Sequence, residues 1–392
     1  MMQSAHLTTS QPPISGRSYE KCAEDLYPSL AVFSSGYHQV HVYLSLILCV
    51  FGIGLNCLNV VVLCQKHMRN SNNLLLSSLA ISDGLVMFIY IIYDLGFRLV
   101  ARLENGMTKD YAYLLLVCIV GQNLFHTFST WIIVVLAAYR LLYVHAGPQA
   151  RVVCAPLRVW FAIAMIALTS IVLTVPLVFA HEVTQYRKPN SNISGLFEVD
   201  YVDNSVLQTI LFLNSALLVK AIPILLIWVL STILINKIRE TQLTRRRLLP
   251  PETIRSSFTF PSPSTGCSAD VERLRKLHWF FFKSCGGFDA CRQSAQPTKM
   301  LLAVALMYII TYLPQSLVMY PFIFSQSVML ILNRYMGRCF QTQVYERLGD
   351  LMDLLTLSNN GINFIIYCVM SAQFRNTFVA LLTSGRSKLR HF

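Results

Sequence analysis

Charged and amide side chains stand inside long apolar runs of this sequence, where they could bind an ion or a charged ligand. Asp83 ends the stretch LAISD, Arg140 lies inside LAAYRLLYV, and Asn359 and Asn363 are four residues apart in LSNNGINFIIY. Polar groups are costly in an apolar medium, and those kept there are commonly functional. Because residues three or four apart share one face of a helix, we expect one buried polar cluster. Its predicted members are Asn56, Asp83, Ser129, Asn359 and Asn363.

A lone ionised carboxylate at Asp83 would be very unfavourable in an apolar interior. We therefore expect Asp83 to be protonated or neutralised by a bound cation such as sodium. A hydrogen-bond network that only packs helices together explains the same residues, so both interpretations stay open.

Catalytic and metal chemistry are not expected. His126 and Ser129 lie three residues apart on one apolar stretch, but no oxyanion loop or nucleophile turn accompanies them. No cysteine and histidine spacing typical of a metal site is found either. The predicted function is therefore not an enzyme.

The composition indicates a membrane protein. The 392 residues are 54% hydrophobic and only 13% charged, against roughly 25% charged in soluble domains. The net charge of +13 could indicate nucleic acid, but basic residues between apolar runs favour cytoplasmic loops. Spanning helices need about 20 mostly apolar residues. Seven runs qualify, near 41–65, 73–97, 111–144, 157–180, 206–236, 300–325 and 347–370, which predicts an all-α membrane protein with a seven-transmembrane helix bundle.

Lysines and arginines are concentrated in every second loop, and this pattern predicts the orientation of the chain in the membrane. They concentrate after spans one, three and five and in the tail, so the N-terminus is expected outside and the C-terminus in the cytosol. Residues 1–40 lack a signal-peptide pattern and are predicted to be extracellular, and 238–299 form a long, partly disordered cytoplasmic loop. The sequon at Asn192 falls in an outside loop and is a predicted glycosylation site.

Three prolines interrupt predicted spans. Pro176, Pro223 and Pro314 lie in spans four, five and six, where each removes a backbone hydrogen bond and can kink its helix. Kinks in spans five and six would act as levers for opening the cytoplasmic end, although prolines are also simply frequent in membrane helices. The chain shows no matching halves with broken helices, which makes a transporter less favoured.

Several motifs resemble those of rhodopsin-like (family A) G-protein-coupled receptors. NCLNVVVL resembles the first-helix asparagine motif, SSLAISD the second-helix motif, and LAAYRLLYV stands at the Asp-Arg-Tyr motif. NFIIY stands at Asn-Pro-x-x-Tyr with Phe364 in place of proline and ends at Tyr367. SAQFRNTFVALL resembles the short amphipathic eighth helix, so 41–370 would be the receptor domain and 371–392 the eighth helix with a short tail.

The departures from that pattern narrow the resemblance. HTFSTWIIVVLAAYR, LLVKAIP, TKMLLAVALMYIITYLPQS and LGDLMDLLTLSNNGINFIIYCVMSAQFR together resemble invertebrate myosuppressin/FMRFamide-like peptide receptors, which are close to sex-peptide receptors. In that group an aromatic residue often precedes the arginine, as Tyr139 does here. Nematode chemoreceptor-like receptors share some of these features and are the close alternative.

The positions of the cysteines leave one pair outside the membrane as candidates for a disulfide. Residues 181–205 contain no cysteine, so the bridge from span three to the second outside loop that most family A receptors have cannot form. Among 11 cysteines, those in spans or cytosolic loops are expected to be free. Cys22 and Cys339 are the outside candidates for a disulfide.

An Arg-Phe-amide peptide is the ligand class that the resemblance implies, bound at the outward mouth of the bundle. Its guanidinium would pair with a carboxylate of Asp94, Asp350 or Asp353, and aromatic side chains would hold its phenyl ring. Helix-end or packing roles would explain some of these residues equally well. The full predicted ligand set is Tyr90, Tyr93, Asp94, Phe125, His126, Lys220, Gln315, Met319, Asp350 and Asp353.

The resemblance further implies a two-state switch at the plasma membrane. A ligand that binds the open-cytoplasm state more tightly shifts the population toward it, and Arg140 then contacts a heterotrimeric G protein. The residues assigned to coupling and switching are Tyr139, Arg140, Pro223, Pro314 and Tyr367. Arrestin, a receptor kinase and membrane lipid are further expected partners. A chemosensory receptor for a small molecule and a transporter are the alternatives.

Arg140 is expected to reach water or a partner at the cytoplasmic end, with Tyr139 in place of its usual acidic neighbour. Without that adjacent ion pair, the resting state is held less firmly, and we predict measurable ligand-independent signalling. Tyr139→Asp should lower that basal signal, as measured by nucleotide exchange in membranes. An undetectable basal signal in the unaltered protein would contradict this prediction.

Overall fold

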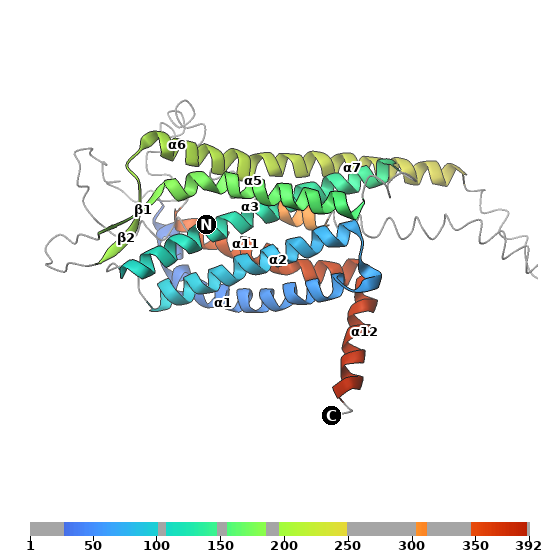
Figure 1. Ribbon diagram of the computed structural model, residues 1–392, viewed down its shortest axis with the longest axis horizontal. Coiled ribbons are helices and arrows are strands. Elements are labelled where there is room, and N and C mark those ends of the chain that lie inside the picture. The colour runs from blue at the N-terminus through green and yellow to red at the C-terminus, as the bar shows by residue number, and fades with distance from the viewer. Residues whose placement is uncertain are drawn as a thin grey trace, which may run out of the picture.

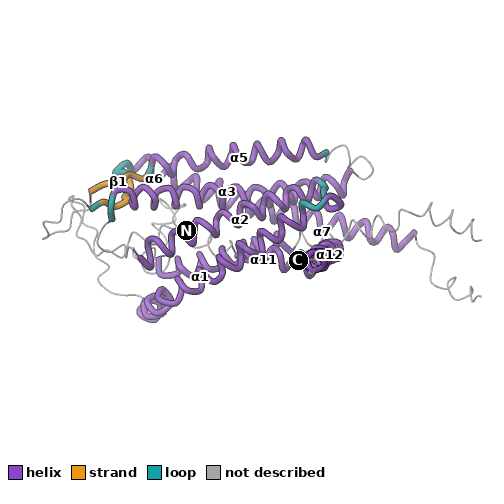
Figure 2. The backbone as a smooth tube through the Cα atoms, turned by 60° about the horizontal axis from the view of Figure 1, so that its bottom comes forward, coloured by secondary structure: helices purple, strands orange, loops and turns teal. Residues whose placement is uncertain are grey.

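The computed structural model describes residues 27–100, 107–146, 155–185, 196–248, 303–311 and 346–389. Within these ranges, five helices are long and apolar enough to cross a membrane, and a sharply bent pair raises the number to six. The long helices run side by side in one bundle (Figures 1 and 2). The expected helical membrane architecture is confirmed.

The first three spans lie close to their predicted positions. They consist of α1 (Pro28–Leu63), the short η2 (Lys66–Met68), α2 (Ser71–Tyr93) with its π-helical continuation η3 (Asp94–Val100), and α3 (Lys109–Ala146). A polar side chain caps the start of α2: the Asn70 side chain accepts a hydrogen bond from the backbone N–H of Asn73 at 2.8 Å.

The next two spans are α5 (Pro156–Phe179) and a composite helix. The composite helix consists of α6 (Ser205–Leu213), the π-helical η6 (Asn214–Ala221) and α7 (Ile222–Leu248). Residues 303–311 are helical and belong to the predicted sixth span.

The last span turns sharply at its end. α11 (Glu346–Met370) is followed by α12 (Ala372–Leu389), and the two helices are bent by 98°. Figure 1 shows α12 leaving the end of the bundle, opposite the end that carries the β1–β2 hairpin. This helix occupies the place of the predicted eighth helix.

α1 begins well before the predicted span, at Pro28 and not near residue 41. Proline is favourable in the first turn of a helix, and Arg347 of α11 donates a hydrogen bond to the Tyr27 carbonyl at 3.2 Å. Rings spaced four residues apart then stack along the helix, with Phe33 and Tyr37 centroids 5.5 Å apart. The extra turns bring His38 and His41 against the rest of the bundle.

A short hairpin covers the end of the bundle opposite α12. Strands β1 (His181–Gln185) and β2 (Phe197–Tyr201) pair antiparallel, with His181 opposite Tyr201. Backbone hydrogen bonds of 2.9 and 2.7 Å join Met107, just before α3, to Phe197. This backbone bridge connects the hairpin to α3 at a place where the sequence excludes the usual disulfide.

The structure describes two of the three prolines expected inside spans. Pro176 is inside α5 near its end, and Pro223 is the second residue of α7, directly after π-helical η6. A proline has no N–H to donate, and the π-helical turn before Pro223 accommodates the missing hydrogen bond there. Pro314 lies outside the described residues.

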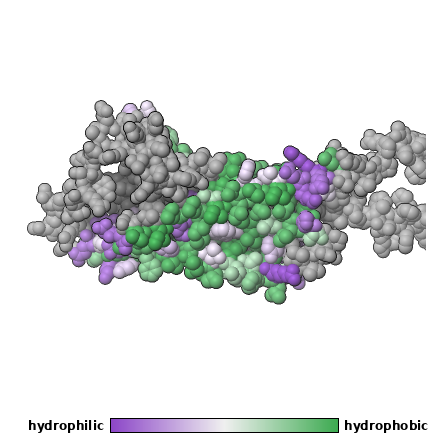
Figure 3. Space-filling view, turned by 90° about the horizontal axis from the view of Figure 1, so that it is seen from above, coloured by the Kyte–Doolittle hydropathy of each residue, from purple (hydrophilic) through white to green (hydrophobic). Residues whose placement is uncertain are grey.

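The middle of the bundle exposes apolar side chains. Figure 3 shows hydrophobic residues over the middle of one face, with hydrophilic residues toward both ends. Phe51, Phe161 and Val369 are among the exposed large side chains. Such an apolar band fits contact with lipid hydrocarbon and not with water.

Candidate functional site

The first candidate site is the Asp83 network, which comprises Asn56, Asp83, Ser129, Asn363 and the Asn360 carbonyl. Ser129 donates a hydrogen bond to one carboxylate oxygen of Asp83 at 2.7 Å, and Asn363 donates to the other at 2.9 Å. α2, α3 and α11 are thereby joined through one buried carboxyl group. The predicted grouping of Asp83 with Ser129 and Asn363 is found in the structure.

Asn56 connects α1 to the same region. Its amide donates to the Gly52 carbonyl at 3.1 Å and to the Asn360 carbonyl at 3.0 Å. A Cβ atom at Gly52 would overlap the Met87 thioether, so α1 packs closely here and a larger residue would require the Met87 side chain to move. Asn359 is buried on α11, but the described hydrogen bonds of Asp83 come from other residues.

The oxygen atoms of Asp83 and Ser129 are of the kind that a sodium ion binds. Both carboxylate oxygens already accept hydrogen bonds, as expected of a network that only packs the helices together. A bound cation near Asp83 stays a prediction.

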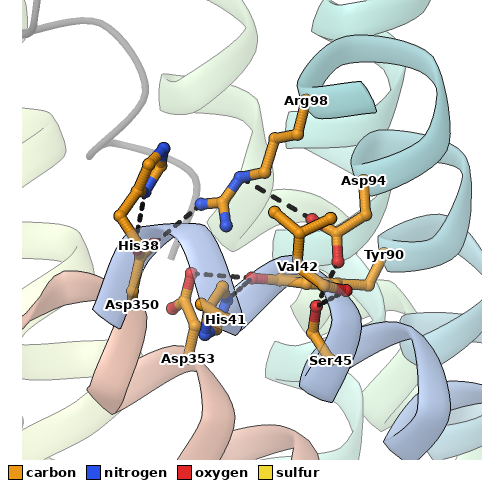
Figure 4. A network of polar contacts seen from close by, with 9 residues as sticks. All are labelled: His38, His41, Val42, Ser45, Tyr90, Asp94, Arg98, Asp350 and Asp353. Atoms are coloured by element: carbon orange, nitrogen blue, oxygen red, sulfur yellow. Dashed lines mark hydrogen bonds and ion pairs between the residues drawn. The ribbon is translucent and has the colours of Figure 1, made fainter. Parts of the chain in front are cut away.

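The second candidate site is the Arg98 network, at the end of the bundle near the hairpin (Figures 1 and 4). It joins side chains of α1, the α2–η3 helix and α11. Its members are His38, His41, Ser45, Tyr90, Asp94, Arg98, Asp350 and Asp353.

Arg98 lies between two acids in this network. Its guanidinium donates to Asp350 at 2.8 Å, and its Nε lies 3.6 Å from Asp94. Its side chain is only 8% exposed, and the side chain of Asp94 is fully buried. The π-helical turn of η3 places Asp94 and Arg98 on the same inward side, and such turns are frequent at functional sites.

α1 contributes two further partners to the same acids. Ser45 donates a hydrogen bond to Asp94, and a ring nitrogen of His38 lies 2.7 Å from Asp350. His38 is 60% exposed, so it forms the outer edge of the network. Each of the two acids thus contacts Arg98 and one side chain of α1.

Asp353 is the least engaged acid of the Arg98 network. It is 4% exposed, and its described hydrogen bond is a long one of 3.4 Å from the Tyr90 hydroxyl. That hydroxyl also contacts His41 at 3.0 Å. Lys220 of η6 is close enough for its charge to interact with Asp353.

Aromatic rings line the same place. The Arg98 guanidinium lies 5.3 Å from the centre of the Tyr93 ring, a favourable cation–π geometry. Tyr90 contacts Tyr93 at 5.9 Å between ring centroids, and Tyr93 contacts Phe97 at 6.0 Å. The predicted residues Tyr90, Tyr93, Asp94, Asp350 and Asp353 therefore lie together.

Phe125 does not belong to this group, which corrects the prediction. It lines an apolar groove of about 340 Å³ between α2, α3 and α5, with Phe128 and Ile171 among its neighbours. Adjacent residues on a helix point about 100° apart, so His126 is buried while Phe125 faces the groove. Gln315 and Met319 lie outside the described residues, as do Cys22, Cys339 and Asn192.

Arg140 is buried in this structure, at 4% exposed, and the expectation that it reaches water is wrong for this conformation. Its position on α3 follows Leu136 and Ala137 by four and three residues, and both of these are buried. The arginine therefore continues the inward face of the helix. Tyr139 next to it is partly buried against the apolar core.

The α12 end is organised by the residue that replaces the usual proline. Phe364 packs edge-on against Phe374 at 5.6 Å and Phe378 at 5.3 Å, both on α12. Tyr367 packs against Phe374 at 5.6 Å as well. Deeper in the bundle, Tyr308 donates a hydrogen bond of 2.9 Å to Thr130 of α3, which ties residues 303–311 to that helix.

Four members of the Arg98 network were not predicted from the sequence: Arg98, His38, His41 and Ser45. Arg98 could have been found, because it follows Asp94 by four residues in DLGFR and such a pair shares one helix face. His38, His41 and Ser45 give no comparable local signal, because their partners lie on other helices.

Comparison with known proteins identifies a receptor family and several relatives. The family model described as "Serpentine type 7TM GPCR chemoreceptor Srw" matches residues 43–257 and 287–385. The G-protein coupled receptor dmsr-1 of Caenorhabditis elegans is 26% identical over 375 residues, which cover 90% of this chain and 70% of that protein. The sex peptide receptor of Drosophila melanogaster is 24% identical over 337 residues, covering 82% and 68%. Sex peptide receptor-related protein 2 of Caenorhabditis elegans is 24% identical over 361 residues, covering 88% and 71%.

Arg98→Ala should strongly destabilise the folded protein, because it leaves Asp94 and Asp350 buried without a cation. Breaking a buried ion pair costs about 3–5 kcal/mol, which would appear as a lowered midpoint of thermal unfolding of the purified protein. Arg158→Ala, at an exposed position on α5, is the matched control and should change little. Equal effects of the two substitutions would show that Arg98 does not neutralise buried acids.

Proposed function

Because the chain belongs to the Srw family of serpentine seven-transmembrane G-protein-coupled receptors, we propose that it is a receptor for an extracellular amidated peptide. It is a multi-pass membrane receptor, and not an enzyme, that acts through a G protein. Because the family is one of receptors, the transporter alternative is abandoned. The peptide ligand would be of the FMRFamide or myosuppressin type.

The observation that carries the proposal is the unmatched charge of the Arg98 network. With the carboxyl groups ionised, Asp94, Asp350 and Asp353 supply three negative charges. Arg98 contacts the first two and shares its one positive charge between them, and the described hydrogen bond of Asp353 is a long one from Tyr90. Lys220 interacts with Asp353 as well, which leaves the network one positive charge short. A guanidinium or ammonium group of a ligand would supply that charge.

The relatives support a peptide more specifically than a small molecule. Two of them are named as sex peptide receptors or related to them. Aromatic side chains beside the acids offer a surface for a phenyl ring next to a basic group. The family model is described as a chemoreceptor, so a small amine that binds Asp353 is the second candidate.

The proposed orientation places the Arg98 network outside and α12 in the cytosol of a cell, at the plasma membrane. Loop charges support this orientation, because the basic residues concentrate on the α12 side. Glycosylation at Asn192, a Cys22–Cys339 bridge, a cytoplasmic loop over 238–299 and contacts with arrestin and a receptor kinase belong to the same proposal.

Activation would release contacts at the centre and at the α12 end. The bond between Tyr308 and Thr130 would hold the sixth span against α3 in the resting state. Its loss would let spans five and six move away, with Pro223 and Pro314 as flexible points. Arg140, enclosed at rest, would then become available to a G-protein helix, with Tyr139 and Tyr367 beside it.

The direct test of the function is agonist-driven nucleotide exchange. Cell membranes containing the receptor and a heterotrimeric G protein are challenged with a library of amidated peptides, and bound GTPγS is measured. At least one peptide with a basic residue near its amidated end should raise the rate. Activation by small amines alone, with every peptide silent, would favour the chemosensory alternative and contradict the proposal.

Asp353→Asn should lower the potency of an activating basic peptide by about 10- to 100-fold, since a hydrogen bond to a charged group contributes about 1.5–3 kcal/mol. Potency is read from dose–response curves at equal surface expression. Asp110→Asn, an exposed position at the start of α3, should leave potency unchanged. An unchanged response of the Asp353 variant would remove this acid from the ligand site.

A further inference from the structure

Two polar atoms at the centre of the Arg98 network have no hydrogen-bond partner among the residues that the structure describes. One is Nη1 of Arg98, which is a donor, and the other is Oδ1 of Asp94, which is an acceptor. Both side chains are more than nine-tenths buried. Buried polar groups are nearly always paired, so an unpaired donor and an unpaired acceptor on two neighbouring side chains point to a bound polar group.

We propose that Arg98 and Asp94 recognise a terminal primary carboxamide of the ligand; the assignment rests on the proposed peptide function and makes it more specific. A primary carboxamide presents one acceptor oxygen and an N–H donor next to each other. Its oxygen accepts from Nη1 of Arg98, and its nitrogen donates to Oδ1 of Asp94. Nε of the same guanidinium lies 3.6 Å from Oδ1 of Asp94, so the guanidinium and the carboxylate are neighbours.

The same pair disfavours a peptide with a free carboxylate. A carboxylate has two acceptor oxygens and no donor, and one of them would face the acceptor oxygen of Asp94. That arrangement places two like charges together and leaves the Asp94 oxygen unpaired, and a site built this way rejects the wrong group strongly.

A cationic ligand group does not fit these two atoms. The guanidinium of Arg98 already lies between Asp94 and Asp350 (Figure 4). A second cation would have only donors to offer to Nη1, which is itself a donor with a positive charge. The basic group of the ligand therefore belongs at Asp353 and the carboxamide at Arg98 and Asp94.

The exposed edge of the network provides an approach to this pair. His38 is 60% exposed and contacts Asp350 at 2.7 Å, and Asp350 in turn contacts Arg98. Rotation of the His38 side chain away from Asp350 would open the network next to the guanidinium. We place the approach of the ligand on this exposed side of the network.

The first test uses the unaltered receptor and one peptide pool ending in Arg-Phe, made as the primary amide, the methyl ester and the free acid. The ester is neutral and accepts hydrogen bonds but cannot donate one, so it isolates the contact with Asp94. We expect the ester to be at least tenfold less potent than the amide in GTPγS exchange, and the acid to be weaker again. Equal potency of amide and ester would overturn the carboxamide assignment.

The second test changes the acceptor in the receptor. Asp94→Asn supplies a donor, so the potency ratio of amide to free acid should fall to within about threefold. Asp350→Asn removes the same charge from the neighbouring acid and should keep the ratio, which separates hydrogen bonding from general charge effects. An equal fall in both variants would overturn the assignment. If Asp94→Asn does not reach the cell surface, the ester comparison on the unaltered receptor decides.

The two levels of the proposal fail differently. If no form of the peptide activates the receptor, the peptide function itself is wrong. If the amide activates but the ester matches it, only the assignment of Arg98 and Asp94 is wrong.

Discussion

A guanidinium with almost no water around it must be neutralised by nearby carboxylates, because an isolated buried charge is very costly. Arg98 meets this requirement with Asp94, one turn before it, and Asp350 on α11. Ser45 and His38 of α1 form further hydrogen bonds with Asp94 and Asp350, respectively. One side chain therefore sets how α1, the end of the second helix and the start of α11 meet. It also places Asp353, on the next turn of α11, beside Tyr90.

The spans and the Asp83 network follow largely from local pattern. Long apolar runs predict the helices, and helical periodicity brings Asn363 to face Asp83. The Arg98–Asp350 pair could not be predicted in this way, because its members lie on different helices and only the folded bundle brings them together. Periodicity also explains the errors: Phe125 turns away from its neighbour into an apolar groove, and Arg140 continues the buried face of α3. The early start of α1 depends on tertiary contacts, among them the bond from Arg347 to Tyr27.

Two departures from the family A pattern are compensated by ordinary packing and hydrogen bonding. The proline usually found in the last motif is Phe364, and its ring packs against two aromatic residues of α12. The loop that carries the hairpin lacks the cysteine of the usual disulfide, and backbone hydrogen bonds between Met107 and Phe197 join the hairpin to α3. In both places the helix or hairpin stays connected to its neighbour, but through different contacts from those of the usual family A receptor.

The central claim is that a ligand is bound at the Arg98 network, between the second helix and α11. The most direct measurement is photo-cross-linking, with benzoylphenylalanine in place of the terminal phenylalanine of an activating amidated peptide and mass spectrometry of the digested receptor. The account predicts cross-links within residues 90–98 or 346–356. Cross-links confined to the β1–β2 hairpin, or to the groove between α2, α3 and α5, would contradict it.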